Sequence, residues 1–393
     1  MTLLLLLYEY DPRVQGGMGG YRHAVELGEQ WTRLGHDVTI VRPRLRTPAE
    51  PTAVRVVESP FTAAAPLRAA SAYAGLLTTA LAEGRRARPD VVYAREMAGP
   101  VPLLVARALG AALVLEVNGD SYQHRRERLR ESGWRMALLD RLQRLSFTRA
   151  DRIVAVTSGL RAMLLERFGL AGDRVVVVEN GANLDRLAPA DAVAARRELG
   201  LTEAPTVGFV GTFFPYQGVS TLIDAAPAIR AACPAARFLV VGDGPARGEW
   251  EARARTAGLA GAFHFPGQVP HAEVGTWINA MDVCVAPFVA DRGEGSPLKL
   301  FDYFACARPV VASDIPAVRH IVDATGACVP VPPEDAGALT GAVLGLLGDT
   351  GARTRLGAAG RAWVVRDHGW DAVAARVLDV CASARAARQS ARR

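Results

Sequence analysis

The chain has 393 residues, half of them apolar and 22% charged, with a formal net charge of +6. This composition excludes a disordered protein, and the length favours two domains of about 100–200 residues each. The arginines are spread along the chain without interleaved aromatic residues, which argues against a nucleic-acid-binding protein. The five cysteines form no CxxC pair and no metal-ligand spacing, which predicts buried thiols in a cytoplasmic protein.

The first half of the chain alternates predicted strands and helices. An apolar run at residues 3–7 is too short for a membrane span or a signal peptide, and it predicts a buried strand. A glycine-rich loop at residues 16–20 follows, and then apolar residues recur at helical spacing. Further strands are predicted at 37–41, 90–93, 112–117 and 152–156, and helices at 69–81 and 101–109. Such alternation is typical of a parallel sheet with helices on both faces.

The pattern restarts after an Ala/Pro/charge-rich stretch at residues 188–205. A helix is predicted at 220–232 and strands at 206–210, 237–241, 263–265, 283–286, 309–312 and 327–329. We therefore predict one domain over residues 1–185 and a second over 186–365. Residues 366–393 are predicted to form a helix that packs back toward the first domain and ends in a frayed tail. Doubly wound sheets bind ligands at the carboxyl ends of their strands, so a cleft between the domains is the expected site.

Residues 292–313 carry the strongest chemical signal. Ser296 and Pro297 favour a helix start, with the serine oxygen as cap, and open amide groups at a helix N-terminus attract phosphate. Lys299 is predicted in that first turn, where a cation is unfavourable unless an anion is bound. It is the single lysine of the chain, and every other residue of the Lys+Arg count is an arginine. We interpret this compact charge as a phosphate ligand rather than as a remnant of codon drift.

Two carboxylates bracket this lysine. Glu294 precedes it, and Asp302 lies one helical turn beyond it on the same face. Such a pair suits sugar hydroxyls on one side, phosphate in the middle and ribose hydroxyls on the other. An acidic pair is also the signature of glycosidase chemistry, which is the rival interpretation.

The segment resembles the donor-binding motif of glycosyltransferase family 4, a family of retaining enzymes. That motif is an acidic residue, seven residues and a second acidic residue, matched here by Glu294 and Asp302 around Ser-Pro-Leu-Lys-Leu-Phe-Asp-Tyr. The resemblance implies an α/β protein of the GT-B fold, with two Rossmann-like β/α/β domains facing across a deep cleft. The N-terminal domain would hold the acceptor and the C-terminal domain the nucleotide-sugar donor. Glu294 would contact the donor sugar, and Asp302 the ribose.

Four further segments, at 16–20, 179–183, 241–245 and 265–269, are similar to family motifs in the same order. By this likeness the residues expected to be catalytic are Glu294, Lys299 and Asn118. The expected donor-binding residues are Gly17, Gly19, Gly20, Gly211, Thr212, Gln217, Gly242, Gly267, Gln268, Val269, Arg292, Gly295, Ser296, Pro297, Leu298 and Asp302.

Two features depart from the family pattern. Thr212 and Gln217 stand where relatives often carry an arginine and a lysine that neutralise the diphosphate. A diphosphate leaving group needs cationic or amide stabilisation, so Lys299 and Arg292 are predicted to provide it. Asn118 stands where many relatives have a histidine near the transferred sugar.

The resemblance implies retaining transfer from a UDP- or GDP-linked sugar, without metal or another cofactor. The favoured acceptor is a small molecule: a specialised metabolite, a cyclitol or a small thiol. A peripheral-membrane enzyme acting on a lipid or envelope glycan stays open, because residues 124–135 are rich in arginine and apolar residues follow at helical spacing, namely Trp134, Leu138, Leu142 and Leu145. A nucleotide-sugar epimerase of the same fold is the other alternative. The sequence leaves the oligomeric state open.

Overall fold

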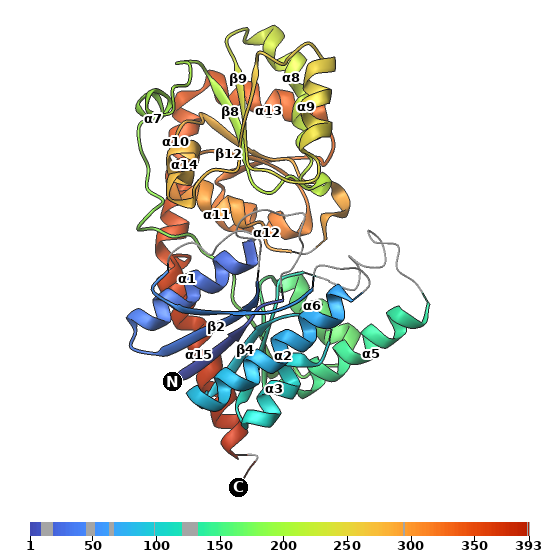
Figure 1. The fold of residues 1–393 in the computed structure, drawn as a ribbon. Helices are drawn as coiled ribbons and strands as arrows, with labels where there is room; N and C mark the ends of the chain where they lie inside the picture. Colours follow the sequence, from blue (N-terminus) through green and yellow to red (C-terminus); the bar gives the residue numbers. More distant parts are fainter. Residues whose placement is uncertain are drawn as a thin grey trace. The chain divides into compact units, whose positions relative to one another are not determined.

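The computed structural model describes residues 1–8, 19–44, 52–62, 67–97, 99–119, 133–293, 295–390 and 392 (Figure 1). Contacts between residues divide the chain into two compact units. The first unit comprises Met1–Glu179, Glu294–Ser296 and Trp370–Arg393. The second comprises Asn180–Gly293 and Pro297–Gly369.

The described residues of the first unit form a seven-stranded parallel sheet in the order β3-β2-β1-β4-β5-β6-β7. Its strands are β1 (Thr2–Leu6), β2 (Asp37–Pro43), β3 (Arg55–Ser59), β4 (Val91–Arg95), β5 (Ala112–Val117), β6 (Arg152–Ala155) and β7 (Val175–Val177). The leucines of β1 alternate between two hydrophobic cores, with Leu4 and Leu6 on one side and Leu3 and Leu5 on the other. Both faces of the sheet are covered, and so the strand is a continuous apolar run.

Helices cover both faces of this sheet. They are α1 (Gly19–Arg33), α2 (Arg68–Ala87), α3 (Val101–Leu109), α5 (Trp134–Arg149), α6 (Ser158–Phe168) and α15 (Trp370–Ser390). Helices α1 and α15 share one core, and the other helices share the second. The indole Nε1 of Trp31 in α1 donates to the carbonyl oxygen of Ala374 in α15 at 2.9 Å, which ties the end of the chain to its beginning. Helix α15 continues to Ser390, into the segment predicted to fray.

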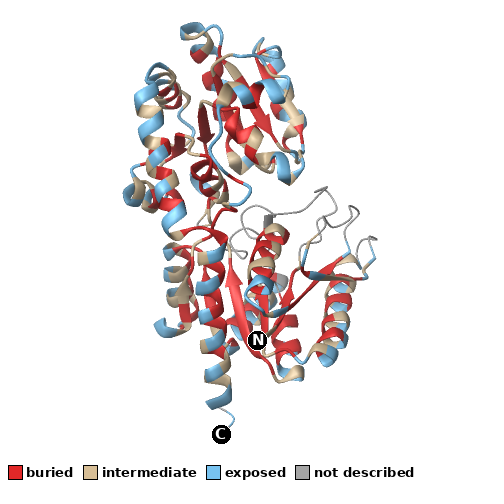
Figure 2. Cartoon of the chain, turned by 90° about the vertical axis from the view of Figure 1, so that its left-hand side faces the viewer, coloured by how far each residue is buried: buried red, intermediate tan, exposed pale blue. Residues whose placement is uncertain are grey.

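The described residues of the second unit form a six-stranded parallel sheet in the order β10-β9-β8-β11-β12-β13. Its strands are β8 (Thr206–Val210), β9 (Arg237–Val241), β10 (Phe263–Gly267), β11 (Val283–Ala286), β12 (Val310–Ser313) and β13 (Cys328–Val331). Its helices are α7 (Ala192–Glu198), α8 (Val219–Ala232), α9 (Arg247–Thr256), α10 (Val274–Asn279), α11 (Leu298–Ala305), α12 (Pro316–Thr325), α13 (Ala336–Gly348) and α14 (Thr350–Asp367). In both units buried residues line the strands, while the outward faces of the helices are exposed (Figure 2).

The strand order of both sheets reverses beside the first strand of the unit. Strand β1 lies between β2 and β4, and β8 lies between β9 and β11. Loops that leave the carboxyl ends of the two strands at such a switch point diverge and leave a crevice. In the second unit these loops follow β8 and β11. The first carries the predicted donor residues from Gly211 to Gln217 and the second carries Arg292, while Lys299 lies in the first turn of α11.

The predicted fold class, with two parallel α/β units, is confirmed. The prediction missed the short strands β3 and β7, and it also missed α7, which lies in the stretch assigned to a linker. Strand β7 has three residues, too few for a periodic pattern to identify. None of the described helices is long and apolar enough to cross a membrane.

Candidate active site

Lys299 is buried in the first turn of α11, with 9% of its surface exposed. Its ammonium nitrogen lies 3.9 Å from the centre of the Phe209 ring and 4.8 Å from that of Phe288. The same nitrogen donates a hydrogen bond to Oε1 of Gln217, the last residue of the 3-10 helix η3 (Pro215–Gln217). Phe209 belongs to β8, and Phe288 follows β11. The lysine is therefore enclosed by the two chain segments that diverge at the switch point.

The charge of this lysine is not balanced by a carboxylate in the part of the chain that the structure describes. Burial lowers the pKa of Lys299 well below its ordinary value, and the positive charge of Arg292 lowers it further. Arg292 lies with its guanidinium carbon 4.2 Å from the centre of the Phe288 ring. The ring faces and the amide oxygen of Gln217 favour the ammonium form without neutralising it, so an anion bound nearby would stabilise it further.

Three of the predicted donor glycines are brought together by hydrogen bonds between loops. The amide of Gly211 donates to the carbonyl of Val241 at 3.0 Å, and that of Gly242 donates to Gly267 at 2.9 Å. A Cβ atom at Gly242 would lie 2.0 Å from the carbonyl oxygen of Gly211, and the φ angle of Gly242 is +131°. A Cβ atom at Gly211 would lie 3.3 Å from the Lys299 ammonium. The loops after β8, β9 and β10 thus form one close-packed layer beside the lysine, which we call the glycine layer.

The N-cap residue of α11 differs from the prediction. Helix α11 starts at Leu298, and its N-cap residue is Pro297, which makes no side-chain cap hydrogen bond. The N-cap position predicted for Ser296 is therefore wrong, because Pro297 occupies it, and proline has no side-chain oxygen to act as a cap. Lys299 remains in the first turn, and Asp302, half-buried, lies one turn beyond it.

The other predicted donor residues occupy the same loops. Thr212 and Leu298 are half-buried, and so is Val269, while Gln268 is exposed after the end of β10. Gly295 and Ser296 precede α11 and are half-buried. Glu294 and Gly17 lie outside the described residues, and the roles expected for them stay predictions.

A buried carboxylate, Glu116, organises the carboxyl end of the first unit's sheet. Its Oε2 accepts hydrogen bonds from Nε2 of His23, at 2.7 Å, and from the hydroxyl of Tyr93. Its Oε1 accepts from Nδ2 of Asn118, and Nε of Arg95 lies 4.0 Å away. Burial by itself raises the pKa of Glu116, but the charges of His23 and Arg95 and the hydrogen bonds from His23 and Tyr93 lower it to about 2.

This cluster connects three predicted site residues to the sheet. Asn118 follows the end of β5 and is half-buried. Gly19 and Gly20 form the first turn of α1, so their predicted place in a loop is wrong, and the helix that they begin carries His23. The hydrogen bond from His23 to Glu116 then anchors this end of α1 to β5.

His23, Tyr93 and Glu116 were not singled out from the sequence. A glutamate within the apolar run at 112–117 was the available signal, because an ionisable group in a buried strand requires hydrogen-bond partners. Phe209 and Phe288 gave no comparable signal, since aromatic residues beside apolar strands are ordinary core residues.

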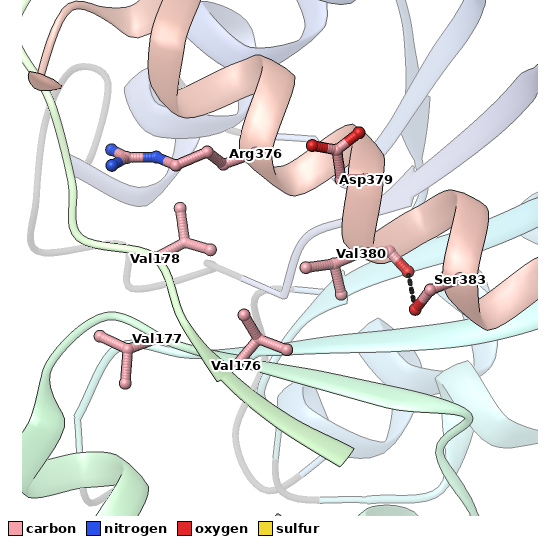
Figure 3. A pocket seen from close by; sticks show the side chains of 7 residues that line it. All are labelled: Val176, Val177, Val178, Arg376, Asp379, Val380 and Ser383. Atoms are coloured by element: carbon pink, nitrogen blue, oxygen red, sulfur yellow. Dashed lines mark hydrogen bonds between the residues drawn. The ribbon is translucent and has the colours of Figure 1, made fainter. Parts of the chain in front are cut away.

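A pocket in the first unit lies between the end of β7 and helix α15 (Figure 3). Its lining residues are Val176, Val177, Val178, Arg376, Asp379, Val380 and Ser383. It contains none of the predicted site residues, and its walls combine three valines with a charged face of α15. We do not assign it to the active site.

Two family models match the chain in consecutive order. Residues 17–186 match the model described as Glycosyltransferase Family 4, and residues 204–349 match the model described as Glycosyl transferases group 1. The chain is 30% identical over 293 residues to the GDP-mannose-dependent alpha-(1-6)-phosphatidylinositol monomannoside mannosyltransferase of Mycobacterium tuberculosis, which covers 72% of this chain and 73% of the relative. It is 27% identical over 411 residues to the glycogen synthase of the same organism, covering 98% and 95% of the two chains.

A solved structure of the Anabaena protein HepE in complex with UDP-glucose is similar to this fold, with a TM-score of 0.76 at 15% sequence identity. The similarity covers 97% of this chain and 99% of that chain. The two parallel α/β units and this likeness define the GT-B fold class. By its sequence, the chain belongs to glycosyltransferase family 4, and it is a glycosyltransferase.

Proposed function

We propose that this glycosyltransferase moves a sugar, with retention of configuration, from a UDP- or GDP-linked donor to a small-molecule acceptor, without a metal. The observation that carries the proposal is the buried ammonium of Lys299, which lacks a balancing carboxylate among the described residues and lies beside the glycine layer. A buried charge of this kind is costly unless an anion accompanies it. The diphosphate of a nucleotide-sugar would supply such an anion.

The position of this ammonium accounts for the two uncharged residues of the donor loop. Gln217 stands where relatives often carry a lysine, and here its side chain accepts a hydrogen bond from Lys299. Lys299 of α11 is thus proposed to supply the positive charge that the loop after β8 lacks. Arg292, whose guanidinium lies against the Phe288 ring, is the second proposed cation.

These groups suit the departure of a diphosphate. As the bond from the sugar to the diphosphate breaks, negative charge develops on the leaving oxygen, and fixed cations and amide groups stabilise it. The first turn of α11 contributes a helix N-terminus, which favours anions. In front-face displacement the leaving phosphate accepts the acceptor's proton, so the protein supplies no nucleophile. Glu294 and Asp302 are then proposed to hold sugar and ribose hydroxyls rather than to act as a glycosidase pair.

The choice of donor rests on the relatives. One is named as GDP-mannose-dependent, and the HepE structure holds UDP-glucose. Both bases therefore belong in the first experiment.

We expect UDP or GDP to raise the melting temperature of the protein, whereas uridine and guanosine have little effect. A ligand that binds only the folded state adds about 2.7 kcal/mol to stability at a concentration of about 100 Kd. The measurement is thermal shift with a concentration series of each compound, followed by transfer from the selected sugar nucleotide. Failure of every nucleoside diphosphate to shift the melting temperature would overturn the proposal, and product formation with an added acceptor separates a transferase from an epimerase.

A second candidate acceptor is a lipid at an anionic membrane surface, because one relative is named as a phosphatidylinositol monomannoside mannosyltransferase. The specific observation is a row of exposed apolar side chains on α5: Trp134 is 72% exposed, Leu138 46% and Leu145 38%. Leu104 of α3, which packs beside α5, is also exposed. Arg141 lies in the same row and is exposed. Apolar side chains with arginine between them are the composition of interfacial helices.

If this face docks on lipid, the protein should co-sediment with phosphatidylinositol-containing vesicles and less with phosphatidylcholine vesicles. The double variant Trp134→Ser/Leu138→Ser should then lose most of the binding. Leu34→Ser is the matched control, because Leu34 lies outside α5 and its 57% exposed fraction falls between those of Leu138 and Trp134. Equal binding by the double variant and the control, or no binding by the wild type, would remove this candidate.

A further inference from the structure

The carboxylate of Glu116 accepts hydrogen bonds at both of its oxygens and is 1% exposed. An ionised carboxylate has no proton to give, so every group that contacts it closely is oriented with its donor toward it. Replacing such a buried charge network by apolar residues is often neutral or stabilising. Stability by itself therefore does not explain why β5 carries a glutamate at position 116.

The ionised carboxylate of Glu116 fixes the orientation of the Asn118 side chain. Its amide has a donor end and an acceptor end, and the donor nitrogen Nδ2 bonds to Glu116. The acceptor oxygen Oδ1 is therefore directed away from the carboxylate. Asn118 lies at the carboxyl end of the sheet, where doubly wound folds bind their substrates.

We infer that Glu116 is a positioning residue that fixes the Asn118 amide, so that Oδ1 accepts a hydrogen bond from a substrate hydroxyl during sugar transfer. This inference rests on the proposed function. The bond to Glu116 uses one hydrogen of Nδ2 and fixes the orientation of the amide, so Oδ1 is the acceptor on the opposite side of the group.

The other oxygen of Glu116 keeps the arrangement rigid. His23 of α1 and Tyr93 of β4 both donate to Oε2, so the carboxylate is held from two further elements. The ring of Trp370 meets the His23 ring edge-on, with centroids 4.9 Å apart. Rotation of Glu116, which would release Asn118, requires breaking these contacts as well.

The test exchanges the carboxylate at position 116 and the amide at position 118. Asn118→Asp places two carboxylates together and should lower kcat by about 100-fold, since an unpaired buried polar group or charge repulsion has effects of this size. Adding Glu116→Gln should recover at least about tenfold, which is the coupling expected of residues in contact. In that double variant the introduced amide nitrogen donates to one oxygen of the introduced carboxylate, and the other oxygen still accepts from substrate. Activity is measured with UDP-glucose and GDP-mannose, and KM is followed separately from kcat.

A second comparison covers the case in which Asn118→Asp does not fold. Glu116→Gln should lower kcat in the wild-type background, and it should have little further effect on kcat in a protein that already carries Asn118→Ala. The single variant Glu116→Gln and the double variant Glu116→Gln/Asn118→Ala should have equal melting temperatures. If Glu116→Gln lowers kcat equally in both backgrounds, or the double exchange recovers nothing, the inference is wrong. UDP and GDP binding by the wild type is measured alongside: its absence points to failure of the proposed function instead.

Discussion

Replacing Lys299 with methionine is expected to reduce kcat by about 10²–10³-fold, the loss seen when one preorganised group that stabilises a leaving charge is removed. The folded protein should be at least as stable as the wild type. Methionine fills nearly the same volume between Phe209 and Phe288, and it removes an ammonium whose burial opposes folding. The expected result is thus a loss of function together with unchanged or increased stability. Steady-state kinetics and urea unfolding measure the two sides separately.

Leu300→Met is the matched control for this variant. Leu300 is fully buried in the same helix, so the substitution also places a methionine in α11 but leaves every charge in place. It should cost less than about 1.5 kcal/mol of stability and little activity. Wild-type turnover by Lys299→Met would show that the ammonium does not serve the diphosphate.

The same lysine predicts a pH effect with a definite sign. Burial lowers the pKa of Lys299, and a bound diphosphate raises it again, so binding takes up protons at pH values between the two. Affinity for UDP or GDP should therefore fall as the pH rises through this range, because the lysine loses its charge. Calorimetry in two buffers of different ionisation enthalpy measures the proton uptake, which should vanish in Lys299→Met.

Gly242→Ala is expected to destabilise the protein by about 3 kcal/mol or more, through backbone strain and overpacking together. The new Cβ atom would lie 2.0 Å from the carbonyl oxygen of Gly211, and φ at this position is +131°. A backbone carbonyl within a hydrogen-bonded layer cannot move by itself, so the loops after β8 and β9 must shift together. A Cβ atom at Gly211 would lie 3.3 Å from the Lys299 ammonium, so a shift of the Gly211 backbone should disturb the lysine, and nucleoside diphosphate binding should weaken as well.

The control for that substitution is Gly248→Ala, further along the same segment. A Cβ atom there would meet nothing within 4 Å, and its φ is not positive. Because Gly248 lies within α9, alanine should be neutral or stabilise by about 0.5–1 kcal/mol. Urea unfolding of both variants provides the measurement. Equal stability of the two variants would show that the glycine layer is not close-packed as described.

The first residues of α1 and α11 show how accurately local sequence rules predict where a helix begins. The rules placed a helix after Ser296-Pro297, which is correct to within a residue or two, but they assigned the cap to the wrong side chain. They also placed Gly19 and Gly20 in a loop, although α1 already begins there. Both errors concern residues at the edge of an element, where the conformation depends on what the neighbouring strand ends provide and not on periodicity.

The sequence by itself determined the parallel α/β class and the family, and it singled out Lys299 as the predicted phosphate ligand. These depend on periodicity, on motif spacing and on a residue that occurs once, all of which are visible along the chain. Only the tertiary structure decided what Lys299 and Asn118 contact. Gln217 is 82 residues from Lys299, and His23 is 93 residues from the Glu116 that orients Asn118. Such partners come together because the strand order reverses beside β1 and β8, and a reversal in strand order leaves no periodic trace in the sequence.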